Sequence, residues 1–282
     1  MALYGRARRS GTNRASFRKQ ELVNQIFSEK RIVNTDLIGL VPAAGKGVRL
    51  GLPYPKELYP IIRNNRYKPV AQFVLDNLSA AGIEHTALVV NETKHQLLGY
   101  FGDGHRFGTH ISYVVQESVN GSDGSTSPGL AHALNAAHHL TRGKTVFFGM
   151  ADTIMQPRNV FACAHQTAQP EDDVILCMFT TQRPEKFGMV RLASDNTVIE
   201  IVDKPKQTDL TEMWGCIIWR PQFTEFLYDA VMRQGKSDFA RIMNDALVSG
   251  LRFRGVHMVG GTYIDLGTYE EIEEMDRRFR EE

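Results

Sequence analysis

Short apolar runs alternate with segments of helical periodicity along most of the chain. The first run, Leu37, Ile38, Leu40 and Val41, is typical of a strand buried on both faces of a sheet. Further runs predict strands at 87–90, 111–115 and 144–150, and helical spacing predicts helices at 70–81, 95–101 and 128–140. This alternation indicates a Rossmann-like α/β fold, with a mixed, mostly parallel sheet flanked by helices. Such sheets bind ligands beyond the carboxyl ends of their strands.

The second half of the chain has a different pattern. Residues 187–192 and 198–202 flank an Asp195-Asn196 turn, which predicts an inserted β-hairpin. Two amphipathic helices are predicted at 223–231 and 239–247, the second with Ser237 as its cap. A strand at 251–259 and a charged helix at 269–280 complete the predicted fold.

The first 36 residues differ in composition from the rest. They carry a group of basic residues, Arg6, Arg8, Arg9, Arg14, Arg18 and Lys19. Leu22, Val23, Ile26 and Phe27 then fall at helical spacing. We therefore expect a basic N-terminal arm with a short helix over 1–36, followed by one domain over 37–282. The arm is interpreted as a solvated extension in preference to an RNA-binding or lipid-binding segment.

Composition narrows the class of protein. A hydrophobic content of 42% is enough to build a substantial core, and a net charge of +1 gives no reason to expect nucleic acid as a partner. The three cysteines are widely spaced, which argues against a disulfide framework or a zinc site. Neither a membrane span nor a signal peptide is predicted, so we expect a cytoplasmic protein with no membrane partner.

A glycine-rich, basic loop follows the first strand. Gly45, Gly47 and Gly51 let the backbone approach a ligand, while Lys46, Arg49 and Lys56 supply positive charge. The spacing fits neither the dinucleotide fingerprint nor the Walker A loop. The loop therefore suits an anionic ligand such as a phosphate chain, and a plain glycine turn is the alternative.

Two aspartates stand at the ends of predicted strands. Asp152 follows the strand that ends at Met150, and Asp265 precedes the helix that begins near Thr268. Two carboxylates at one sheet edge would form the oxygen-rich site that Mg²⁺ prefers when it also binds substrate phosphate. Each aspartate could instead be a helix cap.

The motifs together resemble those of the nucleotidyltransferases that make sugar nucleotides. The resemblance rests on A-A-G-x-G-x-R with P-K-E-L, on Gln116 with G-L-A-H-A, on F-G-M-V-R-L, on I-V-D-K-P, and on D-x-G-T. These blocks occur in the order of that family and extend from about residue 37 to 274. The family is the sugar-1-phosphate nucleotidyltransferases, which include glucose-1-phosphate thymidylyltransferases and uridylyltransferases.

The resemblance implies a role for each motif. It implies that the nucleotide contacts Ala43, Ala44, Gly45, Lys46, Gly47, Val48, Gln116 and Gly129, and that the sugar phosphate contacts Gly188, Asp203 and Lys204. It implies catalytic roles for Arg49, Lys56, Asp152 and Lys204, with Mg²⁺ on Asp152 and Asp265. The family usually has glutamate where this chain has Asp203, so the sugar of typical members does not transfer directly.

The implied reaction moves a nucleotidyl group from a nucleoside triphosphate, UTP or dTTP, to a sugar 1-phosphate. The products are a sugar nucleotide and pyrophosphate, and the family resemblance also leads us to expect a homo-oligomer. Two alternatives remain open. One is a non-catalytic subunit that senses sugar nucleotides. The other is a nucleotidyltransferase that acts on a non-sugar phosphate or phosphonate, with CTP as one candidate donor.

Overall fold

A computed structural model of the chain describes residues 36–47, 50–63, 66–117 and 129–281. They belong to a compact unit that extends from Thr35 to Glu282. The predicted basic arm lies outside the described residues except for Asp36. Val48 and Arg49 of the glycine-rich loop also lie outside them.

The strands and helices follow the predicted alternation. The strands are β1 (Leu37–Pro42), β2 (Pro60–Arg63), β3 (Arg66–Pro69), β4 (His85–Val90), β5 (His110–Val115), β6 (Thr145–Phe148), β7 (Thr153–Gln156), β8 (Val174–Thr180), β9 (Gly188–Leu192), β10 (Val198–Asp203), β11 (Glu212–Trp219), β12 (Phe253–His257) and β13 (Thr262–Asp265). The α-helices are α2 (Val70–Ala80), α3 (His95–Phe101), α4 (Gly129–Ala136), α5 (His138–Thr141), α6 (Val160–Thr167), α7 (Pro221–Met232), α8 (Phe239–Val248) and α9 (Tyr269–Glu281).

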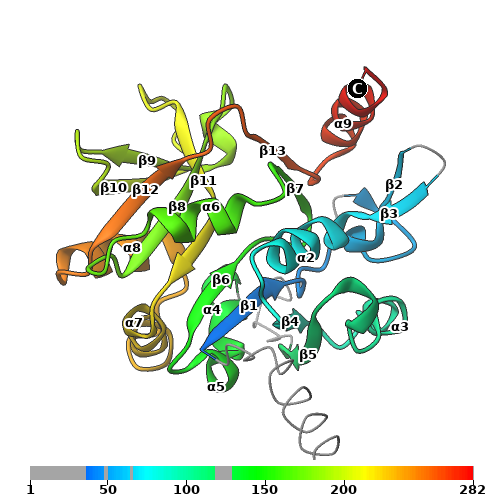
Figure 1. Ribbon diagram of the computed structural model, residues 1–282, viewed down its shortest axis with the longest axis horizontal. Coiled ribbons are helices and arrows are strands. Elements are labelled where there is room, and N and C mark those ends of the chain that lie inside the picture. Colours follow the sequence, from blue (N-terminus) through cyan, green and yellow to red (C-terminus); the bar gives the residue numbers. More distant parts are fainter. Residues whose placement is uncertain (1–35, 48–49, 64–65, 118–128, 282) are drawn as a thin grey trace, which may run out of the picture. The chain divides into compact units, whose positions relative to one another are not determined.

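The main sheet has nine strands and two halves of different character. In one half, β6, β1, β4 and β5 are all parallel. In the other half, β11 runs antiparallel to β6, β8 and β9, and the β9–β10 hairpin forms the edge. Figure 1 shows both halves around the central β1. The predicted mixed, mostly parallel α/β fold with an inserted hairpin is confirmed.

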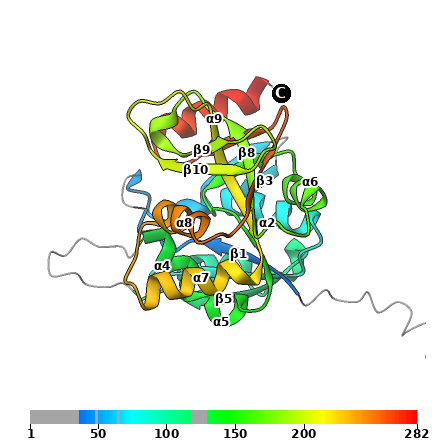
Figure 2. The same cartoon turned by 90° about the vertical axis from the view of Figure 1, so that its left-hand side faces the viewer.

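Apolar residues on the two faces of the sheet pack against different helices. Ile38 and Leu40 of β1 belong to a core with α4, α7 and α8, while Val41 belongs to a core with α2, α3 and α6. These helices lie on opposite sides of the sheet (Figure 2). Gly39 allows close packing of α2, because a Cβ there would come within 2.8 Å of Leu78 Cδ1. Successive side chains of β1 therefore point to opposite faces of the sheet, and both faces are buried.

Local details differ from the sequence predictions at several points. The helix predicted at 128–140 is divided at Ala137, whose N–H bonds to Leu134 O in a tight turn between α4 and α5. The cap of α8 is Asp238 and not Ser237, because the Asp238 carboxylate accepts a hydrogen bond from Arg241 N at 3.1 Å. The β2–β3 and β7–β13 pairs were not predicted.

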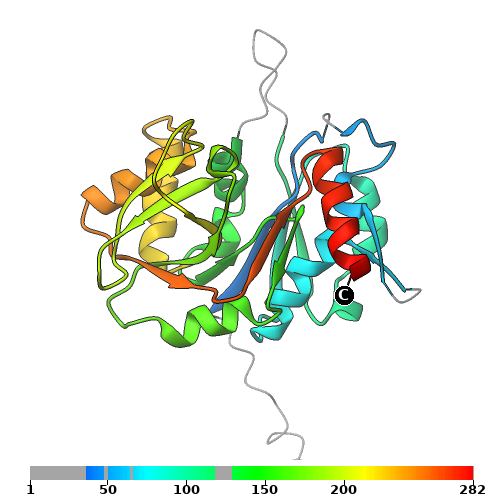
Figure 3. The same cartoon turned by 90° about the horizontal axis from the view of Figure 1, so that it is seen from above.

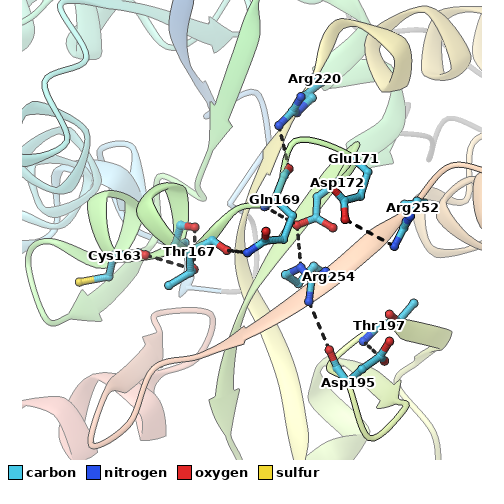
Figure 4. A network of polar contacts seen from close by, with 11 residues as sticks. Cys163, Thr167, Gln169, Glu171, Asp172, Asp195, Thr197, Arg220, Arg252 and Arg254 are labelled. Atoms are coloured by element: carbon cyan, nitrogen blue, oxygen red, sulfur yellow. Dashed lines mark hydrogen bonds and ion pairs between the residues drawn. The ribbon is translucent and has the colours of Figure 1, made fainter.

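The β9–β10 hairpin is fastened at its tip to the neighbouring strand β12. Arg254 of β12 donates to Asp195 O at 3.2 Å and to the buried Asp172 carboxylate at 2.6 Å (Figure 4). Gly255 N donates to Asn196 O at 2.9 Å. The hairpin therefore has a fixed tip, and its other end lies at the carboxyl edge of the sheet, beside the residues described next.

The terminal helix α9 packs beside β13. Ile272 and Met275 of α9 join Leu50, Ile61 and Ile154 in a third apolar cluster below the glycine-rich loop. Figure 3 shows α9 (red) next to the β2–β3 pair. Within the described part of the chain, no helix has the length and apolar character required to cross a membrane.

Candidate active site

The glycine-rich loop leaves the carboxyl end of β1 and is held by the next parallel strand. Asn91, directly after β4, donates to Ala44 O at 2.8 Å and is buried. Ala43 N donates to Val89 O at 2.7 Å. Gly47 has a φ of +64°, a conformation that glycine adopts without strain. Because two backbone positions of the loop are tied to β4, the loop has a defined position at the sheet edge.

Lys56 reaches across the sheet edge to Asp152. Its ammonium group hydrogen-bonds to Asp152 Oδ2, and the two side chains are 15% and 12% exposed. Burial disfavours the charge of Lys56, but the Asp152 carboxylate and, at longer range, Glu57 and Asp265 outweigh it, so the pKa of Lys56 is raised. A permanent cation therefore lies at the carboxylate of Asp152.

A second ion pair lies directly behind the first and was not predicted from the sequence. Lys94 Nζ contacts Glu57 Oε1 at 2.8 Å and Oε2 at 2.6 Å. Glu57 is 2% exposed and Lys94 3%. Burial raises the pKa of Glu57, whereas the charge and hydrogen bonds of Lys94 act in the opposite direction. Glu57 follows Lys56 directly in the chain. Breaking a pair that is buried to this degree is costly, so the pair restrains the backbone beside Lys56.

Asp152 and Asp265 are brought together by the two-stranded β7–β13 sheet. Asp265 pairs with Thr153 in the antiparallel register, and Leu266 N donates to Asp152 O at 3.0 Å. Both aspartates line one cavity. Two carboxylates beside a cavity have the donor chemistry that suits Mg²⁺, with further oxygens supplied by substrate phosphates. Among the described residues, no group of three or more acidic, histidine or cysteine side chains forms a more complete metal site.

The predicted nucleotide-binding residues gather around a small cavity. This cavity, of about 190 Å³, is lined by Ala43, Ala44, Gly45, Gln116 and Gly129, together with Lys56 and Asp152. Gln116 Nε2 is buried and has no hydrogen-bond partner in the described structure. Such an amide costs free energy unless a ligand satisfies it. Lys46 and Gly47 line a separate hollow of about 250 Å³, which borders Lys56 on its other side.

The predicted sugar-phosphate residues line a larger cavity at the root of the hairpin. It has a volume of about 380 Å³ and includes Gly188, Asp203 and Lys204. Lys204 has a φ of +46°, which is unusual for a residue with a side chain. Its N–H donates to Phe187 O at 2.9 Å, and its Nζ lies 3.7 Å from Asp203 Oδ2. Strain of this kind persists where the surrounding structure imposes it, and it is frequent in ligand sites.

Gly188 has a packing role that the sequence did not reveal. A Cβ at this position would lie 2.2 Å from Trp214 Nε1, so only glycine leaves room for the indole ring. Trp214 lines the same cavity, and its Nε1 is buried without a partner in the described structure. Trp214 therefore forms part of the cavity wall.

An ion pair connects the residues before β9 to helix α9, which follows Asp265 in the chain. Lys186 Nζ contacts Glu271 Oε1 at 2.6 Å, and Glu271 Oε2 accepts from Gly267 N at 2.9 Å. Burial would raise the pKa of Glu271, but the Lys186 ammonium and the Gly267 N–H outweigh it, so the pKa is lowered. The sequence offered no signal for this pair, whose members are 85 residues apart.

The two cavities meet at Asp152. Leu130, Met150 and Asp152 line both the small cavity and the larger one. Lys56 lines the small cavity and contacts Asp152. Of the residues predicted for the site, only Val48 and Arg49 lie outside the described residues. The arrangement can therefore place two ligands end to end, with a cation and two carboxylates at their junction.

Comparison with known proteins also indicates a nucleotidyltransferase. The family model for nucleotidyl transferase matches residues 38–282. A low-salt glycan biosynthesis nucleotidyltransferase of Haloferax volcanii is 23% identical over 85% of this chain and 65% of its own length. A glucose-1-phosphate thymidylyltransferase of Streptomyces griseus is 26% identical over 84% of this chain and 64% of its own length. The chain thus spans somewhat less than two thirds of these relatives.

A solved structure resembles the fold over most of the chain. The structure of UDP-glucose pyrophosphorylase complexed with UDP-glucose has a TM-score of 0.69 and 22% sequence identity. The match covers 86% of this chain and 98% of that one. At this identity the likeness concerns the fold alone.

Proposed function

Because the chain belongs to the nucleotidyl transferase family, we propose that it is an enzyme that transfers a nucleotidyl group from a nucleoside triphosphate to a sugar 1-phosphate. The donor is UTP or dTTP, and pyrophosphate is the second product. The observation that carries the proposal is the junction at Asp152, where the small cavity with Gln116 meets the larger cavity with Asp203 and Lys204. Two anionic reactants bound in these cavities meet beside Lys56.

The reaction requires alignment and charge neutralisation more than a strong nucleophile. A phosphate oxygen of the acceptor attacks the α-phosphorus of the triphosphate in line, and the bond to pyrophosphate breaks. Lys56 stays protonated because of its raised pKa, and its ammonium group neutralises charge that accumulates at the α-phosphate. Arg49 and the backbone from Gly45 to Val48 hold the leaving pyrophosphate.

The metal proposal assigns Mg²⁺ to Asp152 and Asp265. When bound, Mg²⁺ supplies positive charge that compensates the repulsion between the two phosphate groups. The β7–β13 pairing supports this assignment, because it holds both carboxylates at one edge without relying on a flexible loop. The Lys56 ammonium contacts one oxygen of Asp152, and the other oxygen would be the one offered to Mg²⁺.

The remaining residues select and orient the ligands. The unpartnered amide of Gln116 hydrogen-bonds to the base, and Gly129 at the start of α4 allows close approach of the backbone. In the acceptor cavity, Lys204 neutralises the acceptor phosphate and Asp203 accepts hydrogen bonds from sugar hydroxyls. The buried Glu57–Lys94 pair positions Lys56 through the chain, since Glu57 follows Lys56 directly.

A matrix of substrates tests the proposal. UTP, dTTP, CTP, ATP and GTP are each combined with Mg²⁺ and with the 1-phosphates of glucose, galactose, mannose and N-acetylglucosamine, and pyrophosphate release is measured. Release that requires both UTP or dTTP and one sugar phosphate, and that is absent in Asp152→Asn, is the expected result. Binding of sugar nucleotides without release under any combination would favour the sensing subunit. A further set replaces the sugar phosphates by a non-sugar phosphate and by a phosphonate, and release only in that set would favour the third alternative.

A further inference from the structure

A second polar cavity lies next to the acceptor cavity and has no role in the reaction described above. Its volume is about 550 Å³, against about 380 Å³ for the acceptor cavity. We call it the distal cavity; Thr180, Gln182, Arg183, Thr262, Glu271 and Glu274 line it and not the acceptor cavity. Phe187, Tyr263 and Asp265 line both. A group that extends from a bound acceptor past these three residues enters the distal cavity.

The boundary between the two cavities also contains an ion pair. Lys186 lines the acceptor cavity and Glu271 lines the distal cavity, and their side chains contact each other at 2.6 Å. Glu271 is additionally held by Gly267 N. The Glu271 carboxylate at this boundary is buried and already has two partners. The boundary between the cavities therefore has a defined position.

The charges of the distal cavity exclude an anionic ligand. Arg183 Nη2 contacts Glu274 Oε2 at 3.2 Å, and the Lys186 ammonium contacts Glu271. Within the described lining, each cation thus has an acidic partner, and a phosphate or carboxylate would meet repulsion from the acids. The cavity instead suits an uncharged group.

Three polar side chains of the distal cavity are available to such a group. In the part of the chain that the structure describes, the side chains of Thr180, Gln182 and Thr262 make no hydrogen bond to another residue, and Thr180 and Gln182 are exposed. Two hydroxyls and an amide provide both donors and acceptors. They match a ligand that carries several hydroxyl groups.

Aromatic rings complete the lining on the side of the shared wall. Phe187 and Tyr263 lie perpendicular to each other, with ring centroids 5.8 Å apart and an interplanar angle of 89°. Both rings line both cavities. A sugar ring has an apolar C–H face and a rim of hydroxyls, so it can cover an aromatic surface and hydrogen-bond to the polar side chains at the same time.

We propose that the distal cavity is a second carbohydrate subsite, which takes an uncharged sugar ring attached to the acceptor sugar phosphate. This inference rests on the proposed function, because it names the acceptor as a glycosylated sugar phosphate. The acceptor phosphate and its first ring occupy the cavity with Asp203 and Lys204. The second ring packs against Tyr263 and Phe187 and hydrogen-bonds to Thr180, Gln182 and Thr262.

A binding experiment tests the subsite without requiring turnover. Saturation-transfer NMR on the full chain uses maltose and cellobiose as probes. We expect transfer to at least one of them in the native protein, and its reduction by at least about fivefold in Thr180→Trp, whose ring fills the distal cavity. Val248→Trp, at a position that is 90% exposed on α8, is the matched control and keeps the native signal. Absence of transfer to both sugars, or an equal signal in Thr180→Trp, would overturn the subsite.

A turnover experiment tests the link to the acceptor. Maltose 1-phosphate and cellobiose 1-phosphate are compared with glucose 1-phosphate, using the donor that the substrate matrix identifies. We expect a disaccharide phosphate to have the higher kcat/KM by at least about tenfold, and Gln182→Ala to lower only that value, whereas Gln234→Ala on the surface changes neither. Equal losses for the mono- and disaccharide phosphates would overturn the inference.

The two experiments separate the subsite from the proposed function. If no donor and acceptor pair releases pyrophosphate but the disaccharide signal depends on Thr180, the proposed function fails and the carbohydrate subsite stands. If glucose 1-phosphate is the best acceptor and no disaccharide signal depends on Thr180, the subsite fails and the proposed function stands. Thermal unfolding of Thr180→Trp beside the native protein confirms that the variant is folded.

Discussion

The proposed nucleotide side and the proposed acceptor side of the site are held in place by different means. On the nucleotide side, Lys56 and Asp152 are mostly buried, and the Glu57–Lys94 pair behind them is almost completely so. On the acceptor side, the side chains of Lys204 and Asp203 are 62% and 45% exposed, and their charges lie 3.7 Å apart. The nucleotide side thus has charges that are positioned before substrate arrives. The proposed acceptor side has exposed charged side chains on a backbone that is bonded to Phe187.

The difference follows from the architecture. The nucleotide side is built on the parallel half of the sheet, where both faces are covered and loops at the strand ends are tied to neighbouring strands. The acceptor side is built on an edge hairpin whose root faces the cavity. Breaking a buried charge pair on the nucleotide side should therefore have larger effects than changing the exposed charges on the acceptor side.

The largest effect is expected for Asp152→Asn. The change removes a candidate metal ligand and leaves the buried Lys56 ammonium without its partner. We expect pyrophosphate release to fall below about one ten-thousandth of the native rate, or about 5 kcal/mol of barrier, while circular dichroism shows an intact fold. An enzyme that retains a tenth of its magnesium-dependent rate would contradict the metal assignment.

Removing one member of the Glu57–Lys94 pair should have the next largest effect. Lys94→Met leaves a buried carboxylate unpaired and should cost about 3–5 kcal/mol of unfolding free energy, measured by urea denaturation. Combining it with Glu57→Leu should recover most of that loss, because neither charge then remains buried. The matched control is Arg233→Met, which breaks the exposed Arg233–Asp229 pair and should cost less than about 1 kcal/mol. Similar losses of unfolding free energy for the buried and the exposed pair would show that burial does not set the cost of breaking them.

Lys56→Ala should affect turnover more than stability. Loss of a positioned cation at the reacting phosphate should cost about 3 kcal/mol of transition-state stabilisation, or roughly 150-fold in kcat/KM. Because the pKa of Lys56 is raised, its charge is complete below its ordinary pKa of 10.5 and is lost only as the pH rises through the higher folded value. The native enzyme should therefore show no loss of kcat/KM assignable to Lys56 between pH 7 and 10 in steady-state assays. Near-native turnover of the alanine variant would remove Lys56 from the mechanism.

On the acceptor side, Lys204→Gly should separate binding from stability. Glycine relieves the positive φ of Lys204 and should add up to about 1 kcal/mol of unfolding free energy, while the lost charge raises the acceptor KM about tenfold. Asn196 at the hairpin tip has a φ of +65° and provides the control. Asn196→Gly should give a similar gain in stability with an unchanged KM. A raised KM in both variants would mean that backbone mobility, and not the charge, sets acceptor binding.

The smallest effect is expected from the Lys186–Glu271 pair and depends on pH. Because the pKa of Glu271 is lowered in the folded protein, its contribution to stability is present above its ordinary value of 4.5 and is lost as the pH falls through the folded value. Glu271→Gln should cost about 1 kcal/mol at pH 7, and the difference from the native protein should shrink as the pH falls below 4.5, in urea titrations at each pH. A constant difference across this range would show that the carboxylate charge is not the stabilising element.

The sequence predicted the fold and the motifs better than the contacts between them. The apolar runs predicted the parallel strands, because β1, β4 and β6 are buried on both faces and so read as continuous hydrophobic segments. The β7–β13 pair was missed because its strands are four residues each and 105 residues separate the partners Thr262 and Gln156, counted as 262 − 156 − 1. No local period marks such a pair.

The same limit applies to the candidate site. Lys56 was found because it stands in a recognisable motif, but Lys94 was not, because nothing in N-E-T-K-H distinguishes a buried lysine from a surface one. Gly188 was assigned to the ligand, and nothing in the sequence indicated that its missing Cβ also makes room for Trp214. The burial of Lys94 and the packing at Gly188 depend on partners that are far apart in the sequence. Neither residue type nor spacing indicates such partners.

The tethered tip of the hairpin restricts how this protein can acquire a new specificity. Arg254 holds one end of the hairpin, and the sheet edge holds the other. These contacts oppose a movement of the whole hairpin that would admit a compound of a different shape. Diversification must instead proceed by replacing individual side chains on a rigid frame. A designer who wishes to change the specificity should therefore vary the residues that line the proposed acceptor cavity and keep the bonds that fix Asp195 and Asn196 at the tip.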